Sequence, residues 1–221
     1  MEKINTPIRH TTIKEQVYET LKQGILSGAF QPGEWLQEAK IAKSLSVSRS
    51  PVREALQQLL GDGLAVNVPN KGVYVKKITT KDMQDIFEVR MCFETIGIQK
   101  SAQNLTDEIR EELRGIRENL LEHYETGDKE SYINEDARLH KVLIKLSGNQ
   151  LIMDLSVRMY TMEHLSRTTS LYSEERFRQS VEEHIGVIDS ILAGDIEKAL
   201  AYNSRHLNLA RDESLRQVDE P

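Results

Sequence analysis

The segment Leu45–Leu60 and the residues that follow it constrain the fold of this chain most strongly. Ser48 is a favourable helix N-cap, and Pro51 suits the first helical turn, where no amide hydrogen is needed. Apolar residues then recur at helical spacing, and they are Val52, Ala55, Leu56, Leu59 and Leu60. The segment therefore predicts a short amphipathic helix that begins with polar and basic residues.

The residues after this helix predict a small hairpin. Two β-prone runs, 64–68 and 73–77, are separated by the turn signal Asn70-Lys71-Gly72. Two further helices are predicted before it, at 13–27 and 38–45. Three helices followed by a hairpin indicate a winged helix-turn-helix, a fold that places a helix end in the major groove of DNA.

The predicted DNA contacts lie at the start of this helix and at the hairpin tip. Arg49 and Arg53 are four residues apart, so they share a helical face and can bind guanine or phosphate. The full set is Ser48, Arg49, Ser50, Arg53, Lys71 and Gly72. The serines can contact phosphates, and Gly72 allows close approach of the backbone. The alternatives are a helical domain with two surface arginines, or a protein–protein module of the same shape.

The charge distribution supports two domains. The chain has 221 residues and a net charge of −6. Residues 1–77 carry 11 Lys/Arg against 7 Asp/Glu, whereas residues 78–221 carry 18 against 28. A basic first domain (1–77) and an acidic second domain (78–221) are therefore expected, with only the first facing phosphates.

The second domain is predicted to be an antiparallel bundle of six helices, which makes the fold class mainly α. Helical periodicity continues from Thr80 to the end of the chain, and no strand signal interrupts it. The predicted helices are 80–103, 106–126, 129–147, 149–171, 174–193 and 195–216.

Several classes of protein are disfavoured by composition. No apolar run approaches the ~20 residues of a membrane span, and the N-terminus lacks the apolar core of a signal peptide. The single cysteine, Cys92, excludes an internal disulfide and is expected to be a core thiol between Met91 and Phe93. A cytoplasmic protein without membrane contact is predicted.

The acidic domain contains a pattern of metal-ligand residues. Asp136 and His140 are four residues apart on an apolar helical face. His184 and His206 lie on the apolar faces of two later helices. Buried polar groups need partners, and one divalent metal ion would satisfy all four side chains. We therefore predict a metal site at Asp136, His140, His184 and His206.

Each histidine taken alone is better explained as a core residue that is hydrogen-bonded to a backbone carbonyl, and only the four ligand residues together favour a metal. His123 and His164 have no ligand partner four residues away, so we interpret them as structural. His10 lies in the N-terminal arm.

The first domain resembles a known family. Pro32-Gly33-Glu34, Val47-Ser48-Arg49-Ser50-Pro51-Val52-Arg53-Glu54-Ala55-Leu56, Gly63-Leu64 and Lys71-Gly72-Val73 are similar to the N-terminal domain of GntR-type bacterial transcription regulators over residues 11–77. In that family the residues matching Arg49, Ser50, Arg53 and Gly72 contact DNA. Many members carry an arginine where this chain has Ala39, so the operator sequence is not predicted.

The second domain resembles the FCD effector domain of the FadR subfamily. The resemblance is carried by Asp136-x-x-x-His140, His184 and His206, with Asp85-Ile86-Phe87-Glu88-Val89-Arg90 upstream. The predicted number of helices, six, resembles that of the shorter, VanR-like branch of this subfamily. In many members the matching four residues bind Zn²⁺, Ni²⁺ or Mn²⁺, and the matching arginine can meet a ligand carboxylate.

This resemblance implies a small carboxylic acid as the effector, with Arg90 and Asn203 as its predicted contacts. Three neutral imidazoles and one carboxylate around a divalent ion leave a +1 centre, which suits an anion.

The resulting hypothesis is a homodimeric, ligand-responsive transcription factor, more often a repressor in this family, which reads a near-palindromic operator in double-stranded DNA. It is not expected to be an enzyme. One alternative is a metal-dependent hydrolase fused to a DNA-binding module, but no histidine here is followed by aspartate. Another is the same regulator with a metal-free site for an organic acid.

Overall fold

The computed structural model describes residues 11–166 and 174–219, with the side chains of residues 11–163 and 174–216. The chain divides after Ile78 into two compact units. Each unit is described separately below. His10 lies outside the described residues, as does the side chain of His164.

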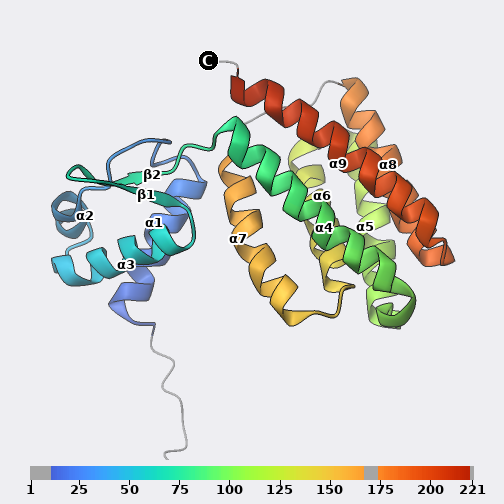
Figure 1. Cartoon of the computed structure of the whole chain (residues 1–221), viewed down its shortest axis with the longest axis horizontal. Coiled ribbons are helices and arrows are strands. Elements are labelled where there is room, and N and C mark those ends of the chain that lie inside the picture. The colour runs from blue at the N-terminus through green and yellow to red at the C-terminus, as the bar shows by residue number, and fades with distance from the viewer. Residues whose placement is uncertain (1–10, 167–173, 220–221) are drawn as a thin grey trace, which may run out of the picture. The chain divides into compact units, whose positions relative to one another are not determined.

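The first unit is a winged helix-turn-helix (Figure 1). Its elements are α1 (Ile13–Leu26), α2 (Glu38–Ser44), α3 (Arg49–Gly61), β1 (Ala65–Val68) and β2 (Gly72–Val75). Helix α1 begins at a capping box, in which Thr12 and Glu15 exchange hydrogen bonds. The core lies between α1 and α3 and buries Val17, Leu21, Ile25, Val52, Ala55, Leu56 and Leu59.

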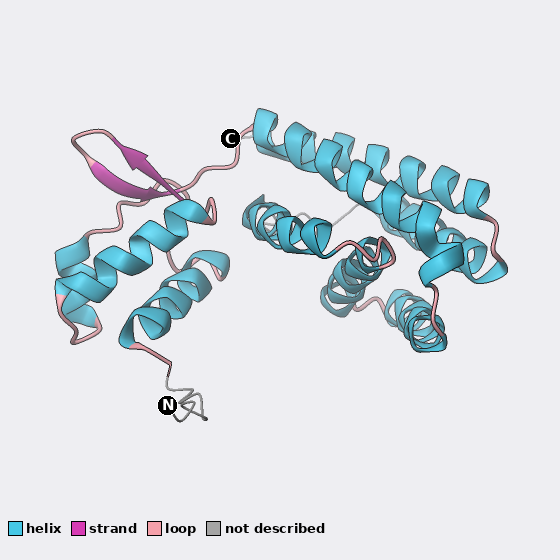
Figure 2. Ribbon diagram, turned by 60° about the horizontal axis from the view of Figure 1, so that its bottom comes forward, coloured by secondary structure: helices cyan, strands magenta, loops and turns pink. Residues whose placement is uncertain are grey.

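The wing is an antiparallel hairpin (Figure 2). The chain before α2 extends it on one side. Val66 pairs with Tyr74 in the β1–β2 register. On the other edge of β2, Leu36 donates its amide to Val73, and Val75 donates to Glu34. Trp35 consequently lies opposite Tyr74. These bonds attach the wing to the segment that leads into α2.

The second unit is a bundle of helices α4 to α9 (Figure 1). Their bounds are Thr80–Asn104, Asp107–Thr126, Lys129–Lys145, Gln150–Ser166, Glu174–Ala193 and Ile196–Asp219. Helix α9 lies along both α4 and α8, while α6 packs against α4 and α5. Within the described residues this bundle and the wing confirm the predicted fold class. No described helix has the length and apolar character that crossing a membrane requires.

A close helix contact brings two parts of the bundle together. A Cβ on Gly97 of α4 would lie 1.8 Å from the backbone oxygen of Leu143 on α6, so only glycine fits there. One helical turn before these positions lie Glu94 and His140, whose side chains meet with 3.0 Å between Oε1 and Nδ1. The small residue therefore helps to build the polar interior of the bundle.

Cys92 does not lie in the core, contrary to the expectation from its apolar neighbours. The thiol is exposed. The buried stripe of α4 runs through Arg90, Glu94 and Gly97. At 100° per residue, Cys92 is displaced by about 200° from Arg90 around the helix.

Candidate functional sites

The first turn of α3 presents polar side chains to solvent. Ser48 occupies the N-cap position with extended backbone angles, but its side chain makes no capping hydrogen bond. Ser48, Arg49 and Ser50 are all exposed. The hydroxyl of Ser48 and the first amides of the helix therefore remain available to an anion.

The two arginines of α3 differ in their environment. Arg53 donates to both carboxylate oxygens of Glu38 on α2, at 3.1 and 3.0 Å. Arg49 forms no ion pair with any described residue. Ser50 donates to Glu54 at 3.3 Å. Among the described residues Arg49 is therefore an exposed cation without an ion pair, although its charge acts on Glu38, whereas Arg53 is oriented by that carboxylate.

The wing tip places Lys71 and Gly72 beside each other. Lys71 is exposed. Gly72 has a φ of 108°, which side chains rarely tolerate, and a Cβ there would lie 2.8 Å from Nε1 of Trp35. The glycine is thus required by the backbone and by the indole beside it. The sequence predicts Gly72 as part of a turn and as a point of close approach to DNA, but it does not predict the contact with Trp35.

The four predicted metal ligands come together inside the bundle. Asp136 and His140 extend from α6, His184 from α8 and His206 from α9, and one ligand atom from each lies within 4.8 Å of the others. Nε2 of His184 is 3.0 Å from Oδ1 of Asp136 and 3.1 Å from Nε2 of His206. Nε2 of His140 is 3.6 Å from the same Oδ1.

The separations of 3.0 and 3.1 Å fit one shared ion, and the 3.6 Å separation is slightly longer. Two ligand atoms that are each about 2.1 Å from a metal lie about 3.0–3.4 Å apart in octahedral or tetrahedral geometry. All three imidazoles turn the same nitrogen, Nε2, toward the centre. The donor set and its spacing therefore suit a divalent cation.

The other nitrogen of each imidazole faces a residue outside the centre. Nδ1 of His184 is 2.8 Å from the hydroxyl of Tyr132. Nδ1 of His206 is 3.2 Å from Oε2 of Glu183, and Nδ1 of His140 is 3.0 Å from Glu94. Such outer partners set the ring orientation and the tautomer of a metal-binding histidine.

The protonation states also suit metal binding. Burial and the neighbouring imidazoles hold the pKa of His206 well below its usual value. Burial likewise lowers the pKa of His184, although Asp136 opposes the shift. Burial works against ionisation of Asp136, yet His184 and His140 hold its pKa well below the usual range. Neutral imidazole and ionised carboxylate are the forms that bind a metal.

His140 differs from the other two histidines. Burial and the charge of Arg90 disfavour its protonation, but Glu94 and Asp136 outweigh them and raise its pKa. Without a cation in the centre, His140 is thus the imidazole that favours carrying a proton between two carboxylates.

The two predicted effector contacts, Arg90 and Asn203, are both buried in the bundle. Arg90 is 3% exposed and donates to Glu94 at 2.8 Å and to Glu163 of α7. Its Nη2 has no hydrogen-bond partner among the described residues. Asn203 is 1% exposed, and neither polar atom of its side chain is paired within the described part of the chain. Unpaired buried groups of this kind require a ligand or water.

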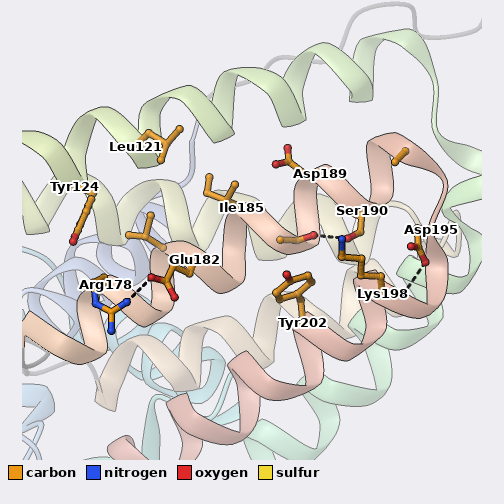
Figure 3. A pocket seen from close by; sticks show the side chains of 13 residues that line it. Leu121, Tyr124, Arg178, Glu182, Ile185, Asp189, Ser190, Asp195, Lys198 and Tyr202 are labelled. Atoms are coloured by element: carbon orange, nitrogen blue, oxygen red, sulfur yellow. Dashed lines mark hydrogen bonds and ion pairs between the residues drawn. The ribbon is translucent and has the colours of Figure 1, made fainter.

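A separate groove of about 750 Å³ lies on the outer side of α8, between α5 and α9 (Figure 3). Ile185 of α8 and Tyr202 of α9 line it, and Arg178 pairs with Glu182 at its edge. None of the predicted metal or effector residues lines this groove.

Comparison with known proteins places the chain in a family. Residues 13–75 match the model for bacterial regulatory proteins of the gntR family, and residues 85–209 match the FCD domain. The chain belongs to the GntR family of transcription regulators and carries an FCD domain. This confirms the resemblance noted in the sequence, and DNA-binding transcription regulation is its function.

Individual relatives agree with this assignment. The chain is 30% identical to the HTH-type regulator YdhC of Bacillus subtilis, over 87% of each protein. It is 28% identical to the gluconate operon transcriptional repressor of Bacillus licheniformis, over 85% of this chain and 78% of the relative. A GntR regulator structure from Rhodococcus sp. RHA1 superposes with a TM-score of 0.75 at 25% identity, covering 91% of this chain and 97% of that one. These relatives are regulators and not enzymes.

Sequence reasoning missed several neighbours of the centre. Tyr132 precedes Asp136 by four residues and so shares its face, a spacing that marks it as a partner. Glu183 is adjacent to His184 in sequence, and adjacent helical positions do not share a face. Glu163 of α7 contacts Arg90 of α4, which is 73 residues away along the chain. Glu94 of α4 contacts His140 on α6 and Arg90 one turn earlier on its own helix.

Proposed function

We propose that this GntR/FCD regulator reads operator DNA with the start of α3 and the wing tip, and that a small carboxylate bound at a metal in the bundle controls it. The observation that carries the proposal is the convergence of Asp136, His140, His184 and His206, with ligand atoms within 4.8 Å of one another. Repression is the expected outcome of DNA binding, because relatives of this chain are repressors.

The DNA contacts are Ser48, Arg49, Ser50, Arg53, Lys71 and Gly72. Arg49 is exposed and free of ion pairs among the described residues, so it can bind a base edge or a phosphate. Arg53 is oriented by Glu38, which supports a contact of fixed direction. A homodimer would present two such surfaces to a near-palindromic operator. The cytoplasm is the corresponding location.

The metal is Zn²⁺, Ni²⁺ or Mn²⁺. Three imidazoles and one carboxylate leave open coordination positions on any of them. Imidazole suits Zn²⁺ and Ni²⁺ alike, and the carboxylate also suits Mn²⁺. When bound, the ion supplies a positive centre for an anionic ligand. Tyr132, Glu94 and Glu183 hold the imidazoles in place from outside.

The effector is proposed to bind beside the metal through Arg90 and Asn203. Nη2 of Arg90 and the side-chain amide of Asn203, which have no partner within the described part of the chain, offer hydrogen bonds to a carboxylic acid. A relative that represses a gluconate operon fits a carboxylate metabolite. Glu94 and Glu163 already offset the charge of Arg90 through Nε and Nη1, so a ligand carboxylate at Nη2 would compete with Glu163 for the attraction of the guanidinium.

This competition suggests how the signal leaves the site. Arg90 lies on α4, which begins at Thr80, directly after the segment that joins the two units. Ligand binding that exchanges partners of Arg90 acts on this helix and on its contact with α7. A ligand shifts such an equilibrium only by its difference in affinity for the two states.

The experiment is a gel-shift titration of the chain on DNA from upstream of its own gene. Wild type is expected to bind, and the Arg49→Ala/Arg53→Ala variant is expected to lose the shift. Equal binding by both proteins would refute the DNA contacts. A screen of small carboxylates by thermal shift, with and without metal, then identifies the ligand class.

A further inference from the structure

The wing carries an exposed aromatic face that the DNA contacts above do not use. Trp35 is 49% exposed, and Val66 is 40% exposed. Both lie opposite Tyr74, Trp35 across one edge of β2 and Val66 across the other. Residues that pair across antiparallel strands project from the same side of the sheet. We refer to Trp35, Val66 and Tyr74 as the wing face.

The indole of Trp35 is held in a defined position on this face. It stacks on the ring of Tyr74 with 6.3 Å between ring centroids and an interplanar angle of 17°. Its Nε1 lies where a Cβ on Gly72 would make a 2.8 Å contact. The N–H group of the indole therefore lies at the wing tip beside Gly72, which follows Lys71 in the sequence.

From this geometry we infer that the wing face is part of the DNA interface, with Trp35 donating its indole N–H to a backbone phosphate. The inference rests on the DNA binding proposed above. An interface that includes the backbone of Gly72 also includes the half-exposed indole in contact with it. Indole Nε1–H is a donor only, and phosphate oxygens are acceptors.

Charge selects DNA as the occupant of this face. Residues 1–77 carry 11 Lys/Arg against 7 Asp/Glu, whereas residues 78–221 carry 18 against 28. The exposed Lys71 adjoins Gly72 at the wing tip. A polyanion fits an apolar face with a cationic edge, because sugars pack on the rings while phosphates meet the lysine.

The composition of the chain provides a direct test. Trp35 is the only tryptophan, so the intrinsic tryptophan emission of the full chain reports on this face alone. The probe is random-sequence duplex DNA at low salt, since phosphate contacts do not depend on sequence. Binding is followed in parallel by the anisotropy of a labelled duplex.

We expect the Trp35 emission to change with the same midpoint as the anisotropy, and acrylamide quenching to fall when DNA is bound. Trp35→Phe keeps a ring on Tyr74 but removes the N–H, and should weaken duplex binding about three- to tenfold, the loss of one hydrogen bond. The Arg49→Ala/Arg53→Ala variant keeps Trp35 and is the control. It should show neither signal at the same DNA concentration.

The outcomes separate this inference from the proposed function. Duplex binding by anisotropy with unchanged emission and quenching would overturn the role of the wing face and leave the proposed function intact. Absence of duplex binding by wild type would contradict both the role of the wing face and the proposed function. Emission that responds to protein concentration and not to DNA would instead assign the face to a second copy of the chain.

Discussion

Nε2 of His184 lies 3.1 Å from Nε2 of His206, and both imidazoles are buried. Two ring nitrogens at this distance either share one proton or share one cation. Burial lowers the pKa of both imidazoles and so disfavours the proton, while Asp136, 3.0 Å from the same nitrogen of His184, offers a further ligand to a cation. In the proposed metal-bound state, this pair would link the stability of the bundle to the ion.

Removing the metal should destabilise the bundle. A ligand present at 100 times its Kd stabilises the folded state by about 2.7 kcal/mol. At about 2–4 °C per kcal/mol, a chelator should lower the bundle transition by about 5–10 °C. Differential scanning calorimetry before and after chelation, and after Zn²⁺ is restored, measures the shift. A transition that does not move would show that the centre holds no stabilising ion.

The hydroxyl of Tyr132 should tune metal affinity. It contacts Nδ1 of His184 at 2.8 Å and donates to Ser180. Tyr132→Phe removes this outer partner, and we expect metal affinity to fall about 10- to 100-fold in a chelator competition assay. Tyr124→Phe is the matched control, because both tyrosine rings pack edge-on against Phe177. Equal losses in the two variants would argue against a specific role of Tyr132.

The ion pair between Glu38 and Arg53 should govern discrimination more than stability. Arg53 is 64% exposed in its side chain, so the pair contributes little to folding. Glu38→Gln removes a negative charge from the surface that we propose faces DNA, and it releases the guanidinium of Arg53. Binding to random duplex should tighten, while the preference for the upstream DNA should fall about tenfold. Competition gel shifts measure both quantities, and an unchanged preference would contradict this role of Glu38.

Ala39 is exposed where many family members carry an arginine. Ala39→Arg should add a phosphate contact, making the salt dependence of DNA binding steeper by about one unit in a plot of log affinity against log salt. Titrations at several salt concentrations test this, with Ala39→Gln as the uncharged control. The same slope for the arginine and glutamine variants would place position 39 away from the phosphates.

Two glycines in the bundle should respond in opposite ways to alanine. In Gly97→Ala the ideal position of the new Cβ is only 1.8 Å from the backbone oxygen of Leu143, so the two atoms collide. We expect a loss of at least about 3 kcal/mol in the free energy of unfolding. Gly115→Ala in α5 meets no atom within 4 Å and should stabilise the helix by about 0.5–1 kcal/mol. Urea denaturation distinguishes the two, and equal effects would contradict the close contact at Gly97.

The elements of the fold were predictable because their signals are local. Each element is indicated by neighbouring residues: helix caps, helical spacing and the Asn70-Lys71-Gly72 turn. The observed bounds of the helices and the wing agree closely with these signals. Helical spacing alone also predicts that the metal-ligand residues point inward, because they lie on the apolar faces of their helices. Which groups pair across elements was not predictable. Glu38 with Arg53 and Glu163 with Arg90 join separate helices, and nothing in the intervening sequence specifies the contact.

The most direct test of the central claim is the metal content of the protein purified without chelator. Elemental analysis of wild type should give about one divalent ion per chain, as expected for one four-ligand site. The His184→Ala/His206→Ala variant should lose that ion while circular dichroism still reports a helical protein. An unchanged metal content in a folded variant would contradict the proposed centre.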